Sequence, residues 1–315
     1  MRSNSVHTPN NRTGRILTNL VLAGAVTLSC HSAAARQSPV YLGSATTFGV
    51  LANTSVTSDS TTSVIGDLGV APGTAVGGFP PGTVSGTIHA DDADATQAQA
   101  DLYTAYNDAT GRNIGAIEEA GNIGGLTLPP GLYFSSSSLA ISSGNLTLDA
   151  QGDALGVWIF QMGSTLTTIS STQVILTNGA QASNIFWQVG SSATLGTSTI
   201  FQGTIMAEAS ITLQSGATLY GRALALDGAV ALDSNTIIIP LLPSPPSFGP
   251  TSRASDGSVT LLITNTPNFV LTLQTSPDLT NWTTFATPIP SVSPCTFIDT
   301  TDSSAATRFY RAFYP

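Results

Sequence analysis

Apolar residues alternate with small polar residues in short segments along the middle of the chain, from about residue 126 to 240. Around residues 191–221 this pattern returns after about eighteen residues, so that Ala193-Thr194-Leu195 is followed by Ile211-Thr212-Leu213. Turn residues such as Gly, Ser, Asn and Asp separate the apolar pieces. Such a repeat predicts a parallel β-solenoid, in which each coil pairs its backbone with the neighbouring coils about 4.8 Å away. The expected inward pairs are Leu146/Leu148, Val174/Leu176, Ala193/Leu195, Ile211/Leu213 and Val230/Leu232.

Each coil holds three short strands, which predicts three faces of different chemistry. The first face is apolar on both sides, so another element must cover its outer surface; it carries "VWIFQM" (157–162), "NIFWQV" (184–189), "GTIMAE" (203–208) and "GRALAL" (221–226). The second face has small outward residues, namely Thr165, Thr167, Ser192, Thr194, Ser210, Thr212, Ala229 and Ala231. The third face has larger and uneven outward residues, including Ile175, Gln202, Tyr220 and Ile238.

A different period marks residues 91–111, "DDADATQAQADLYTAYNDATG". The apolar positions Ala95, Ala98, Leu102, Ala105 and Ala109 recur at helical spacing. Asp91 or Asp92 can cap the start of a helix, and Gly111 can close its end. The narrow Ala stripe can lie close to a flat surface. We therefore expect this helix to cover the first face, on Trp158, Phe160, Trp187, Met206 and Leu224 or on their alternating neighbours.

The two ends of the chain differ from the solenoid. Arg12 and Arg15 precede the apolar run 16–28, and Ala33-Ala34-Ala35 offers a small-residue cleavage site, so residues 1–35 are predicted to be a secretory signal peptide cleaved after about Ala35. The run is too short to span a bilayer, and lipidation at Cys30 remains an alternative. Residues 36–240 form the predicted solenoid domain. A Pro-rich linker, 241–250, then leads to a small all-β module, 251–315.

Charge is scarce, because only 9% of residues are charged and all nine basic residues are Arg. The formal net charge of −9 argues against nucleic acid or an anionic membrane as a partner. Two cysteines, Cys30 and Cys295, cannot form a disulfide framework, and Cys295 is expected to be a small buried residue.

Catalytic chemistry finds little support in the chain. The acidic residues of the predicted solenoid are scattered over turns of different coils, and they comprise Asp149, Asp153, Glu208, Asp227 and Asp233. Arg222 is the one base there, and we expect it to make structural hydrogen bonds or an ion pair. His89 and the "DDAD" run at 91–94 fit a helix start better than a calcium loop. We therefore expect no catalytic residue, no cofactor and no metal.

Longer stretches carry a family resemblance. "LGSATTFGVLANTSVTSDSTTSVIGDLGVAPG", "GGLTLPPGLYF", "NIFWQVGSSATLGTSTIFQGTIMA" and "GRALALDGAVALDSNTI" resemble the DUF3494 ice-binding family over about residues 40–240. The resemblance implies a discontinuous right-handed β-helix, triangular in section, with one long α-helix alongside. It also implies a secreted protein of a cold-adapted microbe that adsorbs to ice through a flat face, without catalytic residues or cofactor. Ala231, Ile200 and Tyr220 depart from the Thr and Asn that are common in this family.

The last part of the chain, "LQTSPDLTNWTTFAT" to "RFYRAFYP", is similar to small β-sandwich modules at the ends of secreted proteins of Verrucomicrobia and Planctomycetes. That resemblance implies attachment to a cell envelope or polymer.

Two hypotheses for the function follow. A row of outward Thr on a rigid lattice presents methyl and hydroxyl groups about 4.8 Å apart between coils and about 6.6 Å apart along a strand, close to the repeats of ice. The first hypothesis is therefore a secreted, monomeric protein whose second face binds the surface of an ice crystal. The alternative is a cell-surface adhesive or structural β-solenoid without ice activity.

Overall fold

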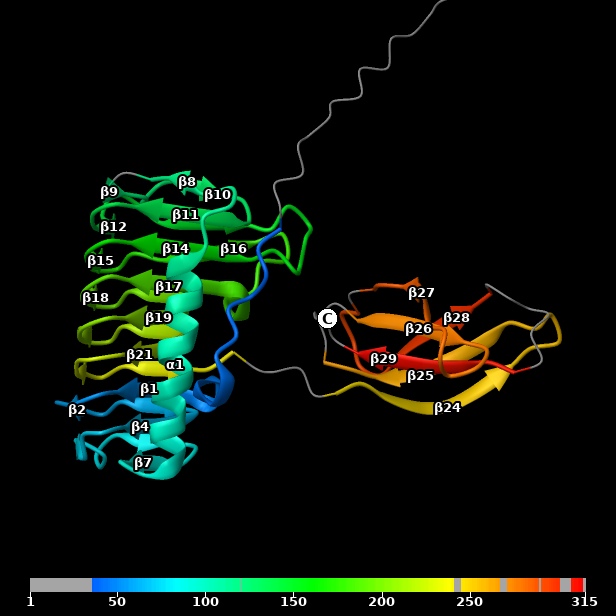
Figure 1. Cartoon of the computed structure of the whole chain (residues 1–315), viewed down its shortest axis with the longest axis horizontal. Coiled ribbons are helices and arrows are strands. Elements are labelled where there is room, and N and C mark those ends of the chain that lie inside the picture. The colour runs from blue at the N-terminus through cyan, green and yellow to red at the C-terminus, as the bar shows by residue number, and fades with distance from the viewer. Residues whose placement is uncertain are drawn as a thin grey trace, which may run out of the picture. The chain divides into compact units, whose positions relative to one another are not determined.

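The computed structural model describes residues 36–119, 121–240, 245–266, 271–288, 290–300 and 307–313. These residues form a parallel β-helix with one long α-helix, followed by two small antiparallel sheets (Figure 1). The predicted signal peptide and Cys30 lie outside the described residues. No helix in the described ranges is long and apolar enough to cross a membrane.

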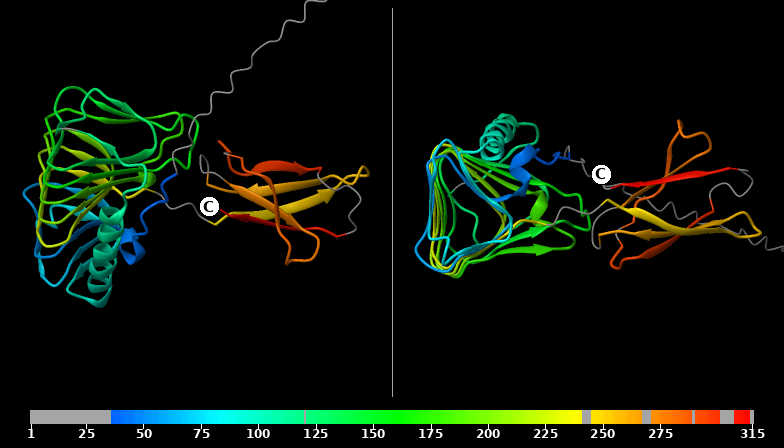
Figure 2. Two further views of the ribbon diagram at one scale, coloured as in Figure 1. Left: turned by 45° about the horizontal axis from the view of Figure 1, so that its top comes forward. Right: turned by 90° about the horizontal axis from the view of Figure 1, so that it is seen from below.

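Three parallel sheets form the sides of a triangular section, which the right-hand view of Figure 2 shows end-on. The first face contains, in spatial order, β7 (Ile88–Ala90), β4 (Asp67–Val70), β1 (Phe48–Ala52), the second halves of β21 (Thr218–Ala225) and β19 (Ile200–Ala207), β17 (Ile185–Val189), β14 (Trp158–Met162), β11 (Gly131–Ser135) and β8 (Ile117–Glu118).

The second face contains β5 (Ala75–Gly77), β2 (Ser55–Ser58), β22 (Val230–Leu232), β20 (Ile211–Leu213), β18 (Ala193–Leu195), β15 (Leu166–Thr168), β12 (Leu139–Ile141) and β9 (Gly121–Asn122). The third face contains β6 (Thr83–Val84), β3 (Ser63–Ile65), β23 (Thr236–Ile238), the first halves of β21 and β19, β16 (Val174–Thr177), β13 (Leu146–Asp149) and β10 (Thr127–Leu128). Because β19 and β21 turn the corner between the two, the first face and part of the third form one continuous sheet.

The stack of coils does not follow the order of the chain. The first strands of the chain, β1, β2 and β3, pair with β21, β22 and β23 near its other end, as in the register Val56↔Val230. From these strands the N-terminal coils extend to β7 at one end of the stack, and the long helix then runs along the stack toward the other end. The remaining coils start there at β8 and continue back to β23, beside the first strands of the chain. The β-helix is therefore discontinuous, as the family resemblance implies.

The corner between the second and third faces uses the same backbone conformation on successive coils. Ser171, Ser198, Gly216 and Ser234 all have positive φ, and the first three donate backbone hydrogen bonds to the next coil. At the next corner, a Cβ on Gly221 would lie 1.8 Å from the carbonyl oxygen of Gly203. Only glycine allows the coils to approach this closely there.

The inside of the triangle is a continuous apolar core with large aromatic side chains near the first face. Tyr133, Phe160, Trp187 and Phe201 stack from coil to coil, with ring centroids 5.3, 4.0 and 4.9 Å apart. The buried indole N–H of Trp187 donates to the carbonyl oxygen of Gln202 at 2.9 Å. Parallel coils place residues of one column directly above one another, so the core fixes the spacing of the faces outside it.

The predicted helix is α1 (Ala93–Gly111), and the carboxylate of its N-cap Asp92 accepts a hydrogen bond from the amide of Ala95 at 2.9 Å. Its 19 residues span about 28 Å, close to the six strand spacings, about 29 Å, that separate β7 from β14. The helix therefore covers most of the stack, as Figure 1 shows.

The prediction that α1 covers the first face is confirmed. The buried residues Ala98, Leu102, Ala105 and Ala109 pack in one apolar cluster with outward residues of that face, which include Leu51, Ile159, Phe186, Met206 and Leu224. Trp158, Phe160 and Trp187 instead point into the solenoid core. Because side chains alternate along the strands, this face has two apolar sides. The inner side packs in the solenoid core, and the outer side packs against α1.

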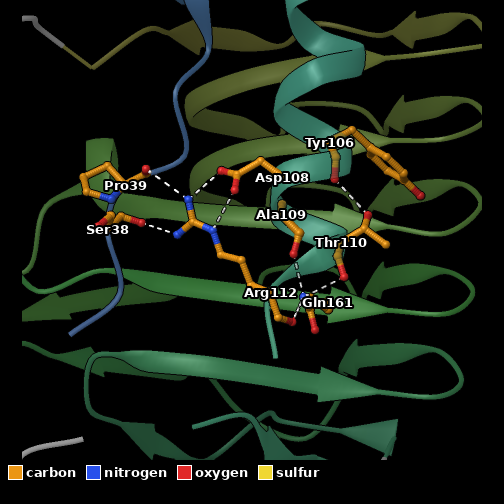
Figure 3. A network of polar contacts seen from close by, with 8 residues as sticks. All are labelled: Ser38, Pro39, Tyr106, Asp108, Ala109, Thr110, Arg112 and Gln161. Atoms are coloured by element: carbon orange, nitrogen blue, oxygen red, sulfur yellow. Dashed lines mark hydrogen bonds and ion pairs between the residues drawn. The ribbon is translucent and has the colours of Figure 1, made fainter. Parts of the chain in front are cut away.

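The helix end is held by side chains rather than by Gly111. Arg112, which follows α1, forms an ion pair with Asp108 at 2.6 Å and donates to the carbonyl oxygens of Ser38 and Pro39 (Figure 3). The N-terminal segment from residue 36 is thereby held against the end of the helix. Further along it, η1 (Gly43–Thr47) contacts α1 through Ser44, whose hydroxyl donates to Asp101 at 2.6 Å.

The C-terminal module consists of two three-stranded antiparallel sheets around a small apolar core. One sheet contains β24 (Ser247–Arg253), β25 (Val259–Thr264) and β28 (Cys295–Asp299). The other contains β27 (Thr283–Ala286), β26 (Thr272–Ser276) and β29 (Phe309–Phe313). Cys295 is a free, buried thiol in this core, as expected, and burial raises its pKa.

The last four residues of the predicted linker, 241–250, belong to a strand in the structure, because β24 begins at Ser247. Pro250, which suggested a linker, lies where the register of β24 and β25 shifts between Phe248 and Thr251. A proline is tolerated at such an irregularity of an edge strand, where its missing N–H is not required for pairing.

Candidate functional site

The second face presents a column of small side chains in one register. Thr167, Thr194, Thr212 and Ala231 occupy the central outward positions of β15, β18, β20 and β22, and each pairs with the next. All four lie between inward residues, which are apolar except for Thr168; Ile211 and Leu213 beside Thr212 are an example. The alternation predicted from the sequence therefore holds on these strands.

A second column lies beside the first, at the start of the same strands. Thr165, Ser192, Ser210 and Ala229 precede β15, β18, β20 and β22. Their carbonyl groups continue the ladder, since Leu166, Ala193 and Ile211 donate backbone hydrogen bonds to Ser192, Ser210 and Ala229. The fold thus brings together all eight residues that the sequence proposed for this face.

The central column continues beyond the predicted residues at both ends. Ala231 pairs with Thr57 of β2, and Thr57 pairs with Gly77 of β5. At the other end, Thr167 pairs with Ala140 of β12, and Ala140 pairs with Asn122 of β9. Sequence reasoning missed Thr57 because it lies in the N-terminal half, whose short strands were not assigned to a face. The alternation in "SVTS" (55–58) is the signal that could have found it.

The central hydroxyl groups are not used within the protein. Thr167, Thr194 and Thr212 make no side-chain hydrogen bond with any residue that the structure describes. By contrast, the inward Thr168 hydroxyl pairs with Thr199 at 2.9 Å and accepts from the amide of Gly196 at 2.8 Å. The central outward Thr side chains are therefore free to contact a ligand or water, while the inward Thr168 stabilises the corner.

Charge is absent from the strands of the second face and appears only at its margins. None of the eight strands contains an acidic or basic residue. Glu208 and Asp227 lie in exposed turns that precede β20 and β22. A surface without charges binds water weakly and uniformly, so this face differs from the rest of an acidic protein.

The other residues singled out from the sequence have structural roles. The guanidinium group of Arg222 is buried and donates to the carbonyl oxygen of Thr46 at 2.8 Å, and burial lowers its pKa to about 10. The ring of His89 contacts the N-cap Asp92 at 2.7 Å. The hydrogen bond from the Ala95 amide, followed by this contact with His89, holds the pKa of Asp92 below its ordinary value. No group of three metal-ligating side chains occurs within the described ranges.

Comparison with known proteins decides the family. A model described as ice-binding-like matches residues 50–238. The chain belongs to this ice-binding-like family. The match ends at the last strand of the β-helix and leaves the C-terminal module outside it.

Relatives in this ice-binding-like family come from bacteria and fungi. An ice-binding protein of Nostoc sp. (strain HG1) is 47% identical over 197 residues, which cover 62% of this chain and 72% of the relative. One of Flavobacterium frigoris (strain PS1) is 37% identical over 219 residues, covering 64% of this chain and 76% of the relative. A crystal structure of an ice-binding protein from an Antarctic biological consortium is 55% identical, covers 65% of this chain and 93% of its own, and has a TM-score of 0.65.

Proposed function

We propose that this protein is a secreted ice-binding protein that adsorbs to ice through its second face. Family membership and the names of its relatives support ice as the ligand. The surface itself supports the choice of face. The single observation that carries the choice is the in-register column of Thr167, Thr194, Thr212 and Ala231, with a second column of small residues beside it.

The spacing of these columns suits a crystalline ligand. Neighbouring coils place equivalent side chains about 4.8 Å apart, and alternate outward residues on one strand lie about 6.6 Å apart. Both distances are close to repeats of the ice lattice. The Thr methyl groups hold water at a fixed distance from the surface, while the unpaired hydroxyl groups of Thr194 and Thr212 anchor it. Water ordered in this way can merge with a growing ice plane.

The other two faces fit this role less well. The outer side of the first face is buried beneath α1. The third face is uneven, because Tyr220 and Ile65 protrude from it and are 40% and 44% exposed. A protruding ring keeps a flat crystal away from its neighbours, so contact with ice would be limited to a few side chains.

Secretion is part of the proposal. The segment 1–35 has the charged start, apolar run and small-residue site of a signal peptide. Cleavage after Ala35 would leave Arg36 as the first residue, directly before the segment that Arg112 holds. An external location is also where an ice-binding surface could meet ice.

The test replaces one residue at the centre of the second face. Thr212→Tyr adds a protruding ring but leaves the inward Ile211 and Leu213 in place, so the free energy of unfolding should change by no more than about 0.5 kcal/mol. Thermal hysteresis should fall sharply, because the ring separates the lattice from Thr194 and Ala231. Thr218→Tyr on the third face is the matched control and should retain nearly full hysteresis.

Two other outcomes would overturn the proposal. Loss of hysteresis in Thr218→Tyr but not in Thr212→Tyr would move the site to the third face. If the parent protein neither shapes ice crystals nor inhibits recrystallisation, the ice-binding function is wrong, and the adhesive or structural β-solenoid takes its place.

A further inference from the structure

A second surface with features of a binding site lies on the C-terminal module, on the outer side of the sheet formed by β27, β26 and β29. There Thr284, Gln274 and Arg311 are cross-strand neighbours in one row. The amide of Gln274 donates to the hydroxyl of Thr284 at 2.8 Å, and its carbonyl oxygen accepts from Nε of Arg311 at 2.7 Å. This relay fixes the plane of the Arg311 guanidinium group.

Aromatic rings flank the same guanidinium group. The Cζ atom of Arg311 lies 4.4 Å from the ring centre of Trp282 and 5.8 Å from that of Phe313. Phe313 is 38% exposed, and together with Arg311 and Ala312 it lines a shallow hollow. Such stacking holds an exposed arginine in one orientation, which lowers the entropy that it loses when it binds a ligand.

The loop before β27 holds Trp282 in turn. The carboxylate of Asp278 accepts hydrogen bonds from the amides of Thr280 and Asn281 at 2.9 and 2.8 Å. The indole N–H of Trp282 donates to the carbonyl oxygen of Leu279 at 3.0 Å. Contacts within the module thus position the Trp282 ring, the Gln274 side chain and the Arg311 guanidinium group.

Arg311 is an exposed arginine whose partners differ from those of Arg36, Arg112 and Arg308. Arg36, Arg112 and Arg308 each form an ion pair with an aspartate. Arg311 has no carboxylate within ion-pair distance among the described residues, although its Nη atoms carry the paired N–H groups that match a carboxylate. An oriented cation with no anionic partner in the described part of the chain, in a protein of net charge −9, indicates an acidic ligand.

The geometry points to an acidic polysaccharide, in which uronic-acid units supply the carboxylate. The rings of Trp282 and Phe313 offer apolar surfaces against which the C–H faces of sugar rings pack. The hydroxyl of Thr284 and the second N–H of the Gln274 amide suit sugar hydroxyl groups. The Asp and Glu side chains of an acidic polypeptide offer the rings only short methylene segments in place of a sugar face. The module would then attach the protein to a uronic-acid-rich matrix while the β-helix remains free to act elsewhere.

The test uses the full chain and measures its binding to polygalacturonate by calorimetry at low salt. Arg311→Gln should weaken binding by about tenfold, because it removes the charge-assisted pair. Arg253→Gln in β24 removes one positive charge from the other sheet and should bind as the parent does. Trp282→Phe retains a ring and should reduce binding less than Trp282→Leu does, with the melting temperature of each variant confirming that the module is folded.

Competing probes make the proposal falsifiable. Neutral dextran should not bind, and added salt should weaken the binding of polygalacturonate. If polyglutamate binds as well as polygalacturonate, the site recognises acidic polypeptide and the polysaccharide assignment is wrong. Equal losses in Arg253→Gln and Arg311→Gln would also overturn it, since net charge alone would then explain binding. None of these measurements involves ice, so they stand apart from the test of the second face.

Discussion

Gln161 in β14 donates a hydrogen bond from Nε2 to the carbonyl oxygen of Arg112 at 2.8 Å, just beyond the end of α1 (Figure 3). The same nitrogen also contacts the carbonyl oxygens of Ala109 and Thr110. The last carbonyl groups of a helix have no partner within it. One side chain from the first face thus satisfies the end of the helix and fixes its position over the sheet.

Replacement of Gln161 by Ala should therefore destabilise the β-helix domain. Its loss leaves helix carbonyl groups unpaired at a partly buried site, which costs about 1–3 kcal/mol. Gln202→Ala, at an outward position of the third face, is the matched control and should change stability by no more than about 0.5 kcal/mol. Chemical denaturation of both variants measures the difference, and equal stabilities would contradict a capping role.

Acid should weaken the contact between η1 and α1. The hydroxyl and amide of Ser44 hold the pKa of Asp101 below its ordinary value, because both donate to its carboxylate. A carboxyl group with a lowered pKa in the folded state adds stability above its unfolded pKa of about 4, and this stability is lost as the pH falls through the folded value. Melting temperatures of the parent should therefore fall more steeply below about pH 4 than those of Asp101→Asn. Ser44→Ala should show a reduced slope as well; a parent curve parallel to that of Asp101→Asn would refute the linkage.

Ala231 interrupts the Thr column of the second face, since Thr212 and Thr57 lie on either side of it. Under the proposed function, Ala231→Thr should raise thermal hysteresis, because it extends an unbroken row of methyl and hydroxyl groups across the junction of the two halves. Stability should change by about 0.5 kcal/mol or less at this outward position. Ile238→Thr on the third face provides the comparison, and it should not raise hysteresis. An equal gain in both variants would mean that Thr content, rather than the position of the column, governs activity.

A protein that ends at residue 240 should fold without the C-terminal module. The module has its own apolar core, formed by residues such as Leu261, Ile263 and Leu273, and the family match ends before it. Residues 36–240 should therefore retain a native β-type circular dichroism spectrum and cooperative unfolding. An unfolded truncated protein beside a native full chain would contradict the division into domains.

Local patterns in the sequence were sufficient for much of the β-helix. The alternation around Ile211 and Leu213 indicated which side of β20 is buried, because successive side chains of a strand point to opposite faces. The Ala stripe of α1 indicated a close approach to a flat surface, and its apolar partners on the first face followed from strands that are apolar on both sides. These features depend on residues within a few positions of one another.

Only the tertiary structure decided how distant parts of the chain meet. The register Thr57↔Ala231 joins two halves of the molecule through backbone hydrogen bonds, and backbone groups are alike at every residue, so no side-chain pattern specifies that pairing. The capping of α1 by Gln161 and the row of Thr284, Gln274 and Arg311 depend in the same way on strands brought together by the fold. The sequence by itself determined the repeat, the faces and the family. The stacking of coils that are remote in the chain decided the extent of the second face, and the antiparallel pairing of β26 with β27 and β29 created the surface around Arg311. Both arise from contacts across strands rather than along them.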